Sequence, residues 1–253
     1  MTGYPLNSLN NNISNSFPSP STVAKYLFKI ICILVLLNIV NIFIQHTMIL
    51  DPWKAAYVDR YLNFNGENTF QSFFSTLILL FASLLLFVIY VLEKTKPEGL
   101  WKRQWFMLAV IFAFLSLDES IQIHETFTPF VQELFTGNTF SGLLYFAWII
   151  PYSILLLLIV IYFLKFVLLQ PARTRRLFFV GGFLFVGGAV GLEMVEGYVF
   201  KLYGAGHIYN DVLCCIEELL EMIGVTVFIY ALVEYLSKHA NVKLLVAHKA
   251  MIK

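Results

Sequence analysis

Carboxylates in three apolar stretches of this sequence are the residues best placed to do chemistry. Seven of them occur there: Asp118, Glu119, Glu193, Glu196, Glu217, Glu218 and Glu221. An ionised carboxylate near the centre of a membrane helix costs about 2.5–3.5 kcal/mol, so seven such groups cannot all face lipid. They must turn inward, share protons, coordinate a metal ion or line a wet cavity.

Helical spacing favours a common face for these acids. Glu193 and Glu196 are three residues apart, and Glu217 and Glu221 are four apart. Both separations place side chains on the same side of a helix. The three stretches can therefore contribute to one shared site.

The stretch SLDESIQIHE adds His124 and Glu125 as candidates for that site. On a continuous helix Asp118, Gln122 and Glu125 form one stripe, at positions i, i+4 and i+7. His124 points well away from that stripe. Helical spacing therefore gives no reason to expect His124 and Asp118 to bind the same metal ion.

Histidines suggest which metal would suit the site. His46, His124 and His207 are all expected at the same end of the protein as the acids. Three histidines with carboxylates suit Zn²⁺, Fe or Mn²⁺. The alternative is that His46 and His207 are ordinary residues of the membrane interface.

Composition defines the class of protein that carries these acids. Of 253 residues, 59% are hydrophobic and only 13% are charged, about half the usual share for a soluble domain. This excludes a soluble globule and a largely disordered chain. A net charge of +1 without a basic stripe argues against binding to nucleic acid, and three cysteines do not make a disulfide scaffold.

The apolar segments predict an all-α polytopic membrane bundle of six transmembrane helices, because a helix needs roughly 20 apolar residues to cross a bilayer. The expected spans are residues 23–46, 70–92, 105–127, 143–169, 177–200 and 212–236. Residues 1–22 are expected to form a flexible polar tail. Residues 23–238 are expected to form the transmembrane domain, and residues 239–253 are expected to form a basic cytoplasmic tail.

Positive charges predict the orientation. Fourteen of the 17 Lys and Arg residues fall on one side of the six spans, which places both termini in the cytoplasm of a bacterial inner membrane. On this topology Asp118, Glu193 and Glu217 lie about 8–12 Å from the outer ends of their helices. Three helices would then place acids at one depth in the outer half of the bilayer.

Three further features bear on this site. The glycine-rich stretch 181–191, with a GxxxG at Gly187 and Gly191, predicts close helix packing that holds Glu193 near a neighbour. Pro151 is expected to kink its span. The polar and aromatic loop 51–71 is long for a connection and could cap the cavity.

Sequence blocks over residues 63–235 resemble a group of uncharacterised bacterial multi-pass membrane proteins. The blocks are NFNGENTFQSFFSTLILL, FLSLDESIQIHE, YFAWIIPY, GGAVGLEMVEG and EELLEMIG. The acidic blocks make the match specific. The resemblance implies a six-helix bacterial membrane protein and indicates no activity.

Three functions fit this pattern. The first is a metal-dependent membrane enzyme, in which a divalent ion bound by the acids, with His124, activates water for a lipid or quinone-like substrate. The second is a proton- or cation-coupled transporter or sensor, although the apolar inner halves of the acidic helices argue against a through-channel. The third is a structural accessory subunit of a membrane complex. The pattern favours an outward-opening acidic cavity that binds a cation, and it assigns no catalytic residue or oligomeric state.

Overall fold

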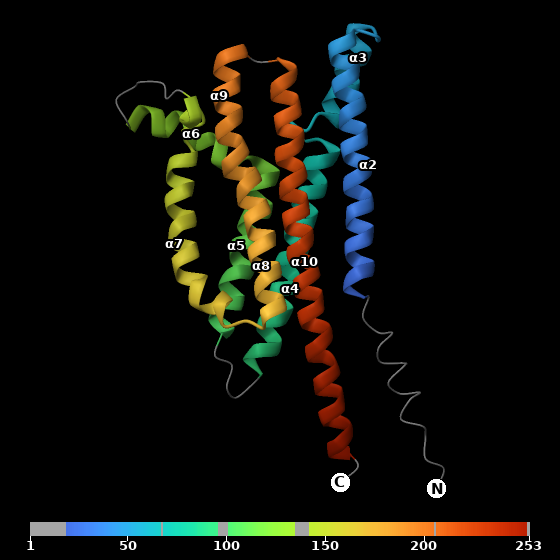
Figure 1. Ribbon diagram of the computed structural model, residues 1–253, viewed down its shortest axis with the longest axis vertical. Helices are drawn as coiled ribbons and strands as arrows, with labels where there is room; N and C mark the ends of the chain where they lie inside the picture. Colours follow the sequence, from blue (N-terminus) through green and yellow to red (C-terminus); the bar gives the residue numbers. More distant parts are fainter. Residues whose placement is uncertain (1–18, 67, 96–100, 135–141, 205, 252–253) are drawn as a thin grey trace.

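The computed structural model describes residues 19–66, 68–95, 101–134, 142–204 and 206–251, with side chains described as far as Lys238. Helices account for nearly all of this part of the chain (Figure 1). Within the described residues, five helical segments are long and apolar enough to cross a membrane: Pro20–Thr47, Phe70–Lys94, Lys102–Ile121, Ile149–Leu168 and Ala172–Tyr203. The all-α membrane-type architecture is thus confirmed, and the expected sixth span lies within a helix that is not among these five.

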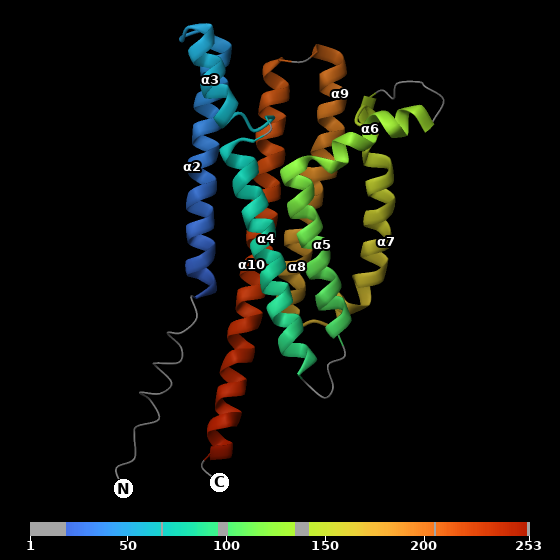
Figure 2. The ribbon, with the colours of Figure 1, turned by 180° about the vertical axis from the view of Figure 1, so that it is seen from behind.

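That remaining helix, α10 (Ile208–Met251), is the centre of the bundle. It packs against α2 (Pro20–Thr47), α4 (Phe70–Lys94), α8 (Ala172–Val186) and α9 (Glu193–Tyr203). Figures 1 and 2 show it running antiparallel to α2 between these neighbours. Helix α2 begins at Pro20, capped by the Ser19 hydroxyl, three residues before the predicted start of the first span at residue 23. Residues 1–18 of the predicted polar tail lie outside the described residues.

The expected loop 51–71 contains a helix, α3 (Pro52–Leu62), that folds back beside the end of α2. Asn41 of α2 is buried and donates to Asp59 Oδ1 of α3 at 2.9 Å. Asn38, also buried, accepts from the Phe64 backbone N–H at 3.3 Å. These bonds give partners to two polar side chains within an apolar helix. Without partners, the buried amide groups would destabilise the fold.

Helix α4 pairs along its length with α5 (Lys102–Ile121). A capping box between Thr69 and Ser72 determines where α4 begins. Gln122 ends α5, because its φ and ψ of 50° are left-handed and cannot continue a right-handed helix. The chain then turns into α6 (Ile123–Leu134), so the expected span 105–127 is shorter than predicted.

Helix α7 (Ile149–Leu168) follows a short 3₁₀ turn, η1 (Gly142–Leu144), and stands apart from the bundle over most of its length (Figure 1). Pro151 lies in the first turn of α7, where its missing N–H breaks no hydrogen bond. The expected proline kink in mid-span is therefore wrong. At the other end of α7, the Phe166 ring packs on Trp105 of α5 with centroids 4.9 Å apart.

A π-helical turn, η2 (Gly187–Leu192), joins α8 to α9 within one continuous apolar segment. The turn packs against α10. Such turns insert one extra residue into a helix and occur often at functional sites. Here the turn lies directly before Glu193 and so changes the face on which the following acids project.

Glycines bring α8 and η2 into close contact with α10, but they are not the predicted pair. A Cβ on Gly187 or Gly191 would meet no atom within 4 Å. A Cβ on Gly188 would instead lie 2.8 Å from the Glu217 carbonyl oxygen, and one on Gly224 would lie 2.7 Å from the Gly181 carbonyl oxygen. The glycine-rich segment packs closely as expected, through different residues, because the π turn rotates the contact face.

This contact predicts that Gly224→Ala destabilises the protein by about 1–3 kcal/mol, because the added methyl group forces two backbones apart. Gly182→Ala is the matched control, since a Cβ there has open space. The control should be neutral or stabilising by about 0.5–1 kcal/mol. Thermal unfolding in detergent measures both variants, and equal unfolding temperatures would contradict the proposed close approach.

Candidate functional site

A cavity of about 1560 Å³ lies between α5, α6, α7, α10 and the α8–α9 segment. All nine predicted site residues line it: Asp118, Glu119, His124, Glu125, Glu193, Glu196, Glu217, Glu218 and Glu221. The end of the loop before α4 also contributes, through Phe64, Asn65 and Gly66. Part of the loop expected to cap the cavity thus lines it, and capping itself stays a prediction.

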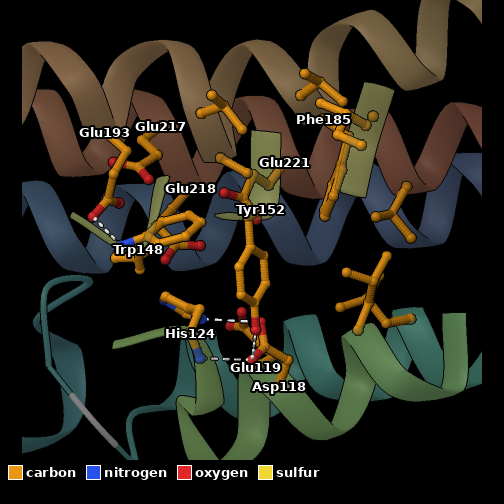
Figure 3. Close-up of a pocket in the computed structure, with 18 of the residues that line it drawn as sticks. Asp118, Glu119, His124, Trp148, Tyr152, Phe185, Glu193, Glu217, Glu218 and Glu221 are labelled. Atoms are coloured by element: carbon orange, nitrogen blue, oxygen red, sulfur yellow. Dashed lines mark hydrogen bonds and ion pairs between the residues drawn. The ribbon is translucent and has the colours of Figure 1, made fainter. Parts of the chain in front are cut away.

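The acids form two facing groups at one end of the cavity (Figure 3). Asp118 and Glu119 project from α5, and Glu193, Glu217 and Glu218 project from α9 and α10 on the opposite side. Asp118, Glu196 and Glu217 are each buried to more than nine-tenths. We call this region, with Glu221, the acidic end of the cavity.

Asp118 is the most fully bonded of these acids. Its Oδ1 accepts from the His124 backbone N–H at 2.9 Å and from the Tyr152 hydroxyl at 3.2 Å. Its Oδ2 lies 2.9 Å from His124 Nδ1, which donates to it. Three donors thus bind this carboxylate and connect α5, α6 and α7 through it. This bonding favours a structural role for Asp118 over the role of a free metal ligand.

The contact between His124 and Asp118 corrects the expectation that His124 points away. A continuous helix would separate the two side chains, but the left-handed Gln122 ends α5 and returns His124 to Asp118. Burial acts to lower the pKa of His124. The hydrogen bond to Asp118 and the nearby carboxylates outweigh burial, so its pKa lies above the usual value.

Two aromatic residues at the start of α7, the N-cap residue Trp148 and Tyr152 of its first turns, complete the site, and the sequence analysis missed both. Trp148 and Tyr152 pack edge to face with centroids 5.1 Å apart, and the Trp148 ring lies 4.6 Å from that of His124. Trp148 donates through Nε1 to Glu193 Oε1 at 3.3 Å. Two features of the sequence could have identified Trp148 and Tyr152 as site residues. They are four positions apart, on one face of a helix, and each ring carries a polar group within an apolar stretch.

Some acceptors of the acidic end have no hydrogen-bond partner. Gln71 donates through Nε2 to Glu218 Oε2 and, at 3.1 Å, to Ser75, but its own Oε1 is buried without a partner. Glu196 Oε1 is also buried without one. A buried oxygen without a donor is destabilising, so these two atoms are the least satisfied polar groups named at the acidic end.

The described side chains do not form a ready metal centre. Within this part of the chain no group of three His, Cys, Asp or Glu residues is close enough to hold a metal ion. His46 is bonded to Asp211 at 2.7 Å, and the His207 ring packs against those of Tyr203 and Tyr209. Neither histidine lines the cavity, so the structure does not unite the three histidines.

The rest of the cavity is apolar. Its walls there consist of aliphatic and aromatic side chains of α5, α7 and α8, and it extends to Val167, Phe178 and Phe228. We call this region the apolar end. One cavity thus joins a carboxylate-lined region to a hydrocarbon-lined region.

These features define the class: an α-helical protein of multi-pass membrane type, with carboxylates facing an internal cavity. The chain belongs to the family described as a domain of unknown function, DUF8692, whose model matches residues 28–236. That match covers the region of the predicted resemblance. No curated protein and no solved structure matches the chain.

The bonding of Asp118 predicts that Asp118→Asn lowers the free energy of unfolding by about 1–3 kcal/mol, because an amide replaces an acceptor that serves three donors. Asp51→Asn is the control, since the exposed Asp51 pairs only with the exposed Lys54, an interaction worth about 0–1 kcal/mol. Thermal unfolding of both variants measures the difference. An unchanged Asp118→Asn protein would show that the α5–α7 contact contributes nothing to stability.

Proposed function

We propose that this protein binds a cation at the acidic end of an intramembrane cavity. The observation that supports this most directly is Glu196 Oε1, which is buried among carboxylates without a hydrogen-bond partner. Gln71 Oε1 adds a second unpartnered acceptor in the same cavity. Buried oxygens without hydrogen-bond donors in a cavity lined by carboxylates suit a positive charge.

Electrostatics explains why the carboxylates would need this partner. Several acids in apolar surroundings repel one another when ionised, and burial adds a desolvation cost to each of them. A bound cation offsets both effects. Neither Lys nor Arg is among the residues that line the cavity. His124 lines it and pairs with Asp118, but a single imidazole cannot balance the eight carboxylates there.

Zn²⁺, Fe and Mn²⁺ are the inorganic candidates, because carboxylates with one imidazole suit these metals. Glu193, Glu217 and Glu221 have flexible side chains, and rotation about them would have to bring three ligands together. Metal-dependent chemistry on a lipid or quinone-like substrate would follow from such a site. We assign no catalytic residue.

We also propose that the chain crosses a bacterial inner membrane six times with both termini in the cytoplasm. The sixth crossing is residues 212–236 of α10, beside the five helical segments already described. The excess of Lys and Arg on one side supports this orientation. The acidic end then faces the outer half of the bilayer.

Cation binding predicts a gain in thermal stability that depends on Glu196. The panel is Mn²⁺, Zn²⁺, tetramethylammonium and dodecyltrimethylammonium, added to protein in nanodiscs at constant ionic strength. A ligand at 100 times its Kd stabilises the native state by about 2.7 kcal/mol. We expect at least one cation to raise the unfolding temperature of the wild type, and Glu196→Gln to reduce that gain.

Glu133→Gln is the matched control for this experiment, because Glu133 is exposed on α6 and does not line the cavity. It should respond to cations as the wild type does. If no cation of the panel stabilises the wild type, the proposed function is wrong. Glu196→Gln would then alter only folding, as a structural accessory role requires.

The apolar end predicts binding without conduction, which separates this function from a cation-coupled transporter. An ion leaving the acidic end would have to pass Phe178, Phe228 and their apolar neighbours without polar ligands. We therefore expect no flux of Na⁺, K⁺, H⁺ or Mn²⁺ in liposomes that contain the protein. Uptake above that of empty liposomes, abolished by Glu196→Gln, would instead support the transporter.

A further inference from the structure

We infer that the cation is the ammonium head group of an amphiphile, whose hydrocarbon tail enters the cavity sideways from the bilayer beside α7. This inference rests on the proposed function and deepens it, because it names the class of ligand. It also explains why the acidic end and the apolar end belong to one cavity.

The size of the cavity is the first argument. Its volume of about 1560 Å³ exceeds the roughly 300–1,000 Å³ of ordinary small-molecule pockets and is far larger than an ion needs. Helix α8 and its continuation line it from Phe178 to Glu196, which spans roughly 27 Å at the rise of a helix. That length approaches the thickness of the hydrocarbon core, so an extended tail fits along it.

Access from the membrane is the second argument. Cavity-lining residues on both sides of α7 are themselves exposed: Val110 of α5 at 52%, Leu164 of α7 at 45% and Phe183 of α8 at 78%. In a bilayer such apolar surfaces face acyl chains. The wall of the cavity is therefore open toward lipid at the apolar end.

The contacts of α7 explain how this opening is maintained. At one end of the helix, Tyr152 bonds Asp118 and Trp148 bonds Glu193. At the other end, the Phe166 ring packs on Trp105. Between these contacts Ile159 packs against the core, whereas Leu157 and Ile161 are exposed, so α7 is held in place with loose packing along its length.

The chemistry of the acidic end is the third argument. Its carboxylates stand on two facing sides, and among the described residues no three His, Cys, Asp or Glu side chains are grouped closely enough to hold a metal ion. An alkylammonium group spreads its charge over a larger volume and is also attracted to aromatic faces. The rings of Trp148 and Tyr152 stand beside the carboxylates of Glu193 and Asp118 (Figure 3).

The experiment compares four probes by thermal unfolding in nanodiscs. Dodecyltrimethylammonium, below its micelle concentration, has both head and tail, tetramethylammonium has the head alone, and dodecanol has the tail alone. Mn²⁺ tests an inorganic ion. We expect dodecyltrimethylammonium to raise the unfolding temperature more than each of the others, and Glu196→Gln to weaken its apparent affinity roughly tenfold or more.

A second variant tests the tail independently of the acids. Gly182 lines the cavity on α8, and a Cβ there meets no atom within 4 Å, so we expect Gly182→Leu to be accommodated and to occupy part of the apolar end. It should weaken dodecyltrimethylammonium binding and leave the tetramethylammonium and Mn²⁺ responses unchanged. Gly187→Leu is the matched control, because Gly187 also has open space but does not line the cavity.

The outcomes separate this inference from the proposed function. A gain with Mn²⁺ or tetramethylammonium that equals or exceeds the gain with dodecyltrimethylammonium would overturn the inference and leave cation binding in place. Equal stabilisation by dodecanol and dodecyltrimethylammonium would overturn it as well, since the head group would then contribute nothing. A protein that no cation stabilises would exclude both proposals.

Discussion

The desolvation of carboxylates is the constraint on which the rest of the structure depends. Charged groups in apolar surroundings need partners, and the described residues supply them unequally. Asp118 has three donors, whereas Glu196 and Gln71 each keep an unpartnered buried oxygen. The first residue joins helices, and the other two carry the unpartnered oxygens on which the proposed cation site rests.

Contacts between helices determine which of these polar groups have partners and which do not. Gly188 and Gly224 bring η2 and α8 against α10 so closely that Glu217 and Glu221 must stand beside Glu193 and Glu196. In contrast, α7 packs loosely. Besides the contacts near its ends it reaches the core through Ile159 and Phe163, while Leu157 and Ile161 stay exposed. Tight packing on one side and loose packing on the other produce one cavity with both a charged and an apolar region.

Local irregularities in two helices place the functional side chains. The left-handed Gln122 ends α5 early and returns His124 to Asp118. The π turn before Glu193 rotates the face of the following helix. Both depart from regular helix geometry, and both lie directly beside the acidic end.

The sequence by itself determined the helical class, the apolar segments and the set of acids that share the cavity. These follow from composition and helical periodicity. The length of each apolar segment and the position of each acid within it can be read directly from the sequence, and acids in such segments must face inward. Only the tertiary structure decided that His124 bonds Asp118, that Gly188 and Gly224 make the close contact instead of Gly187 and Gly191, and that Trp148 and Tyr152 join the site. Each of these depends on where a helix stops, turns or meets a distant neighbour, and regular periodicity does not encode such events.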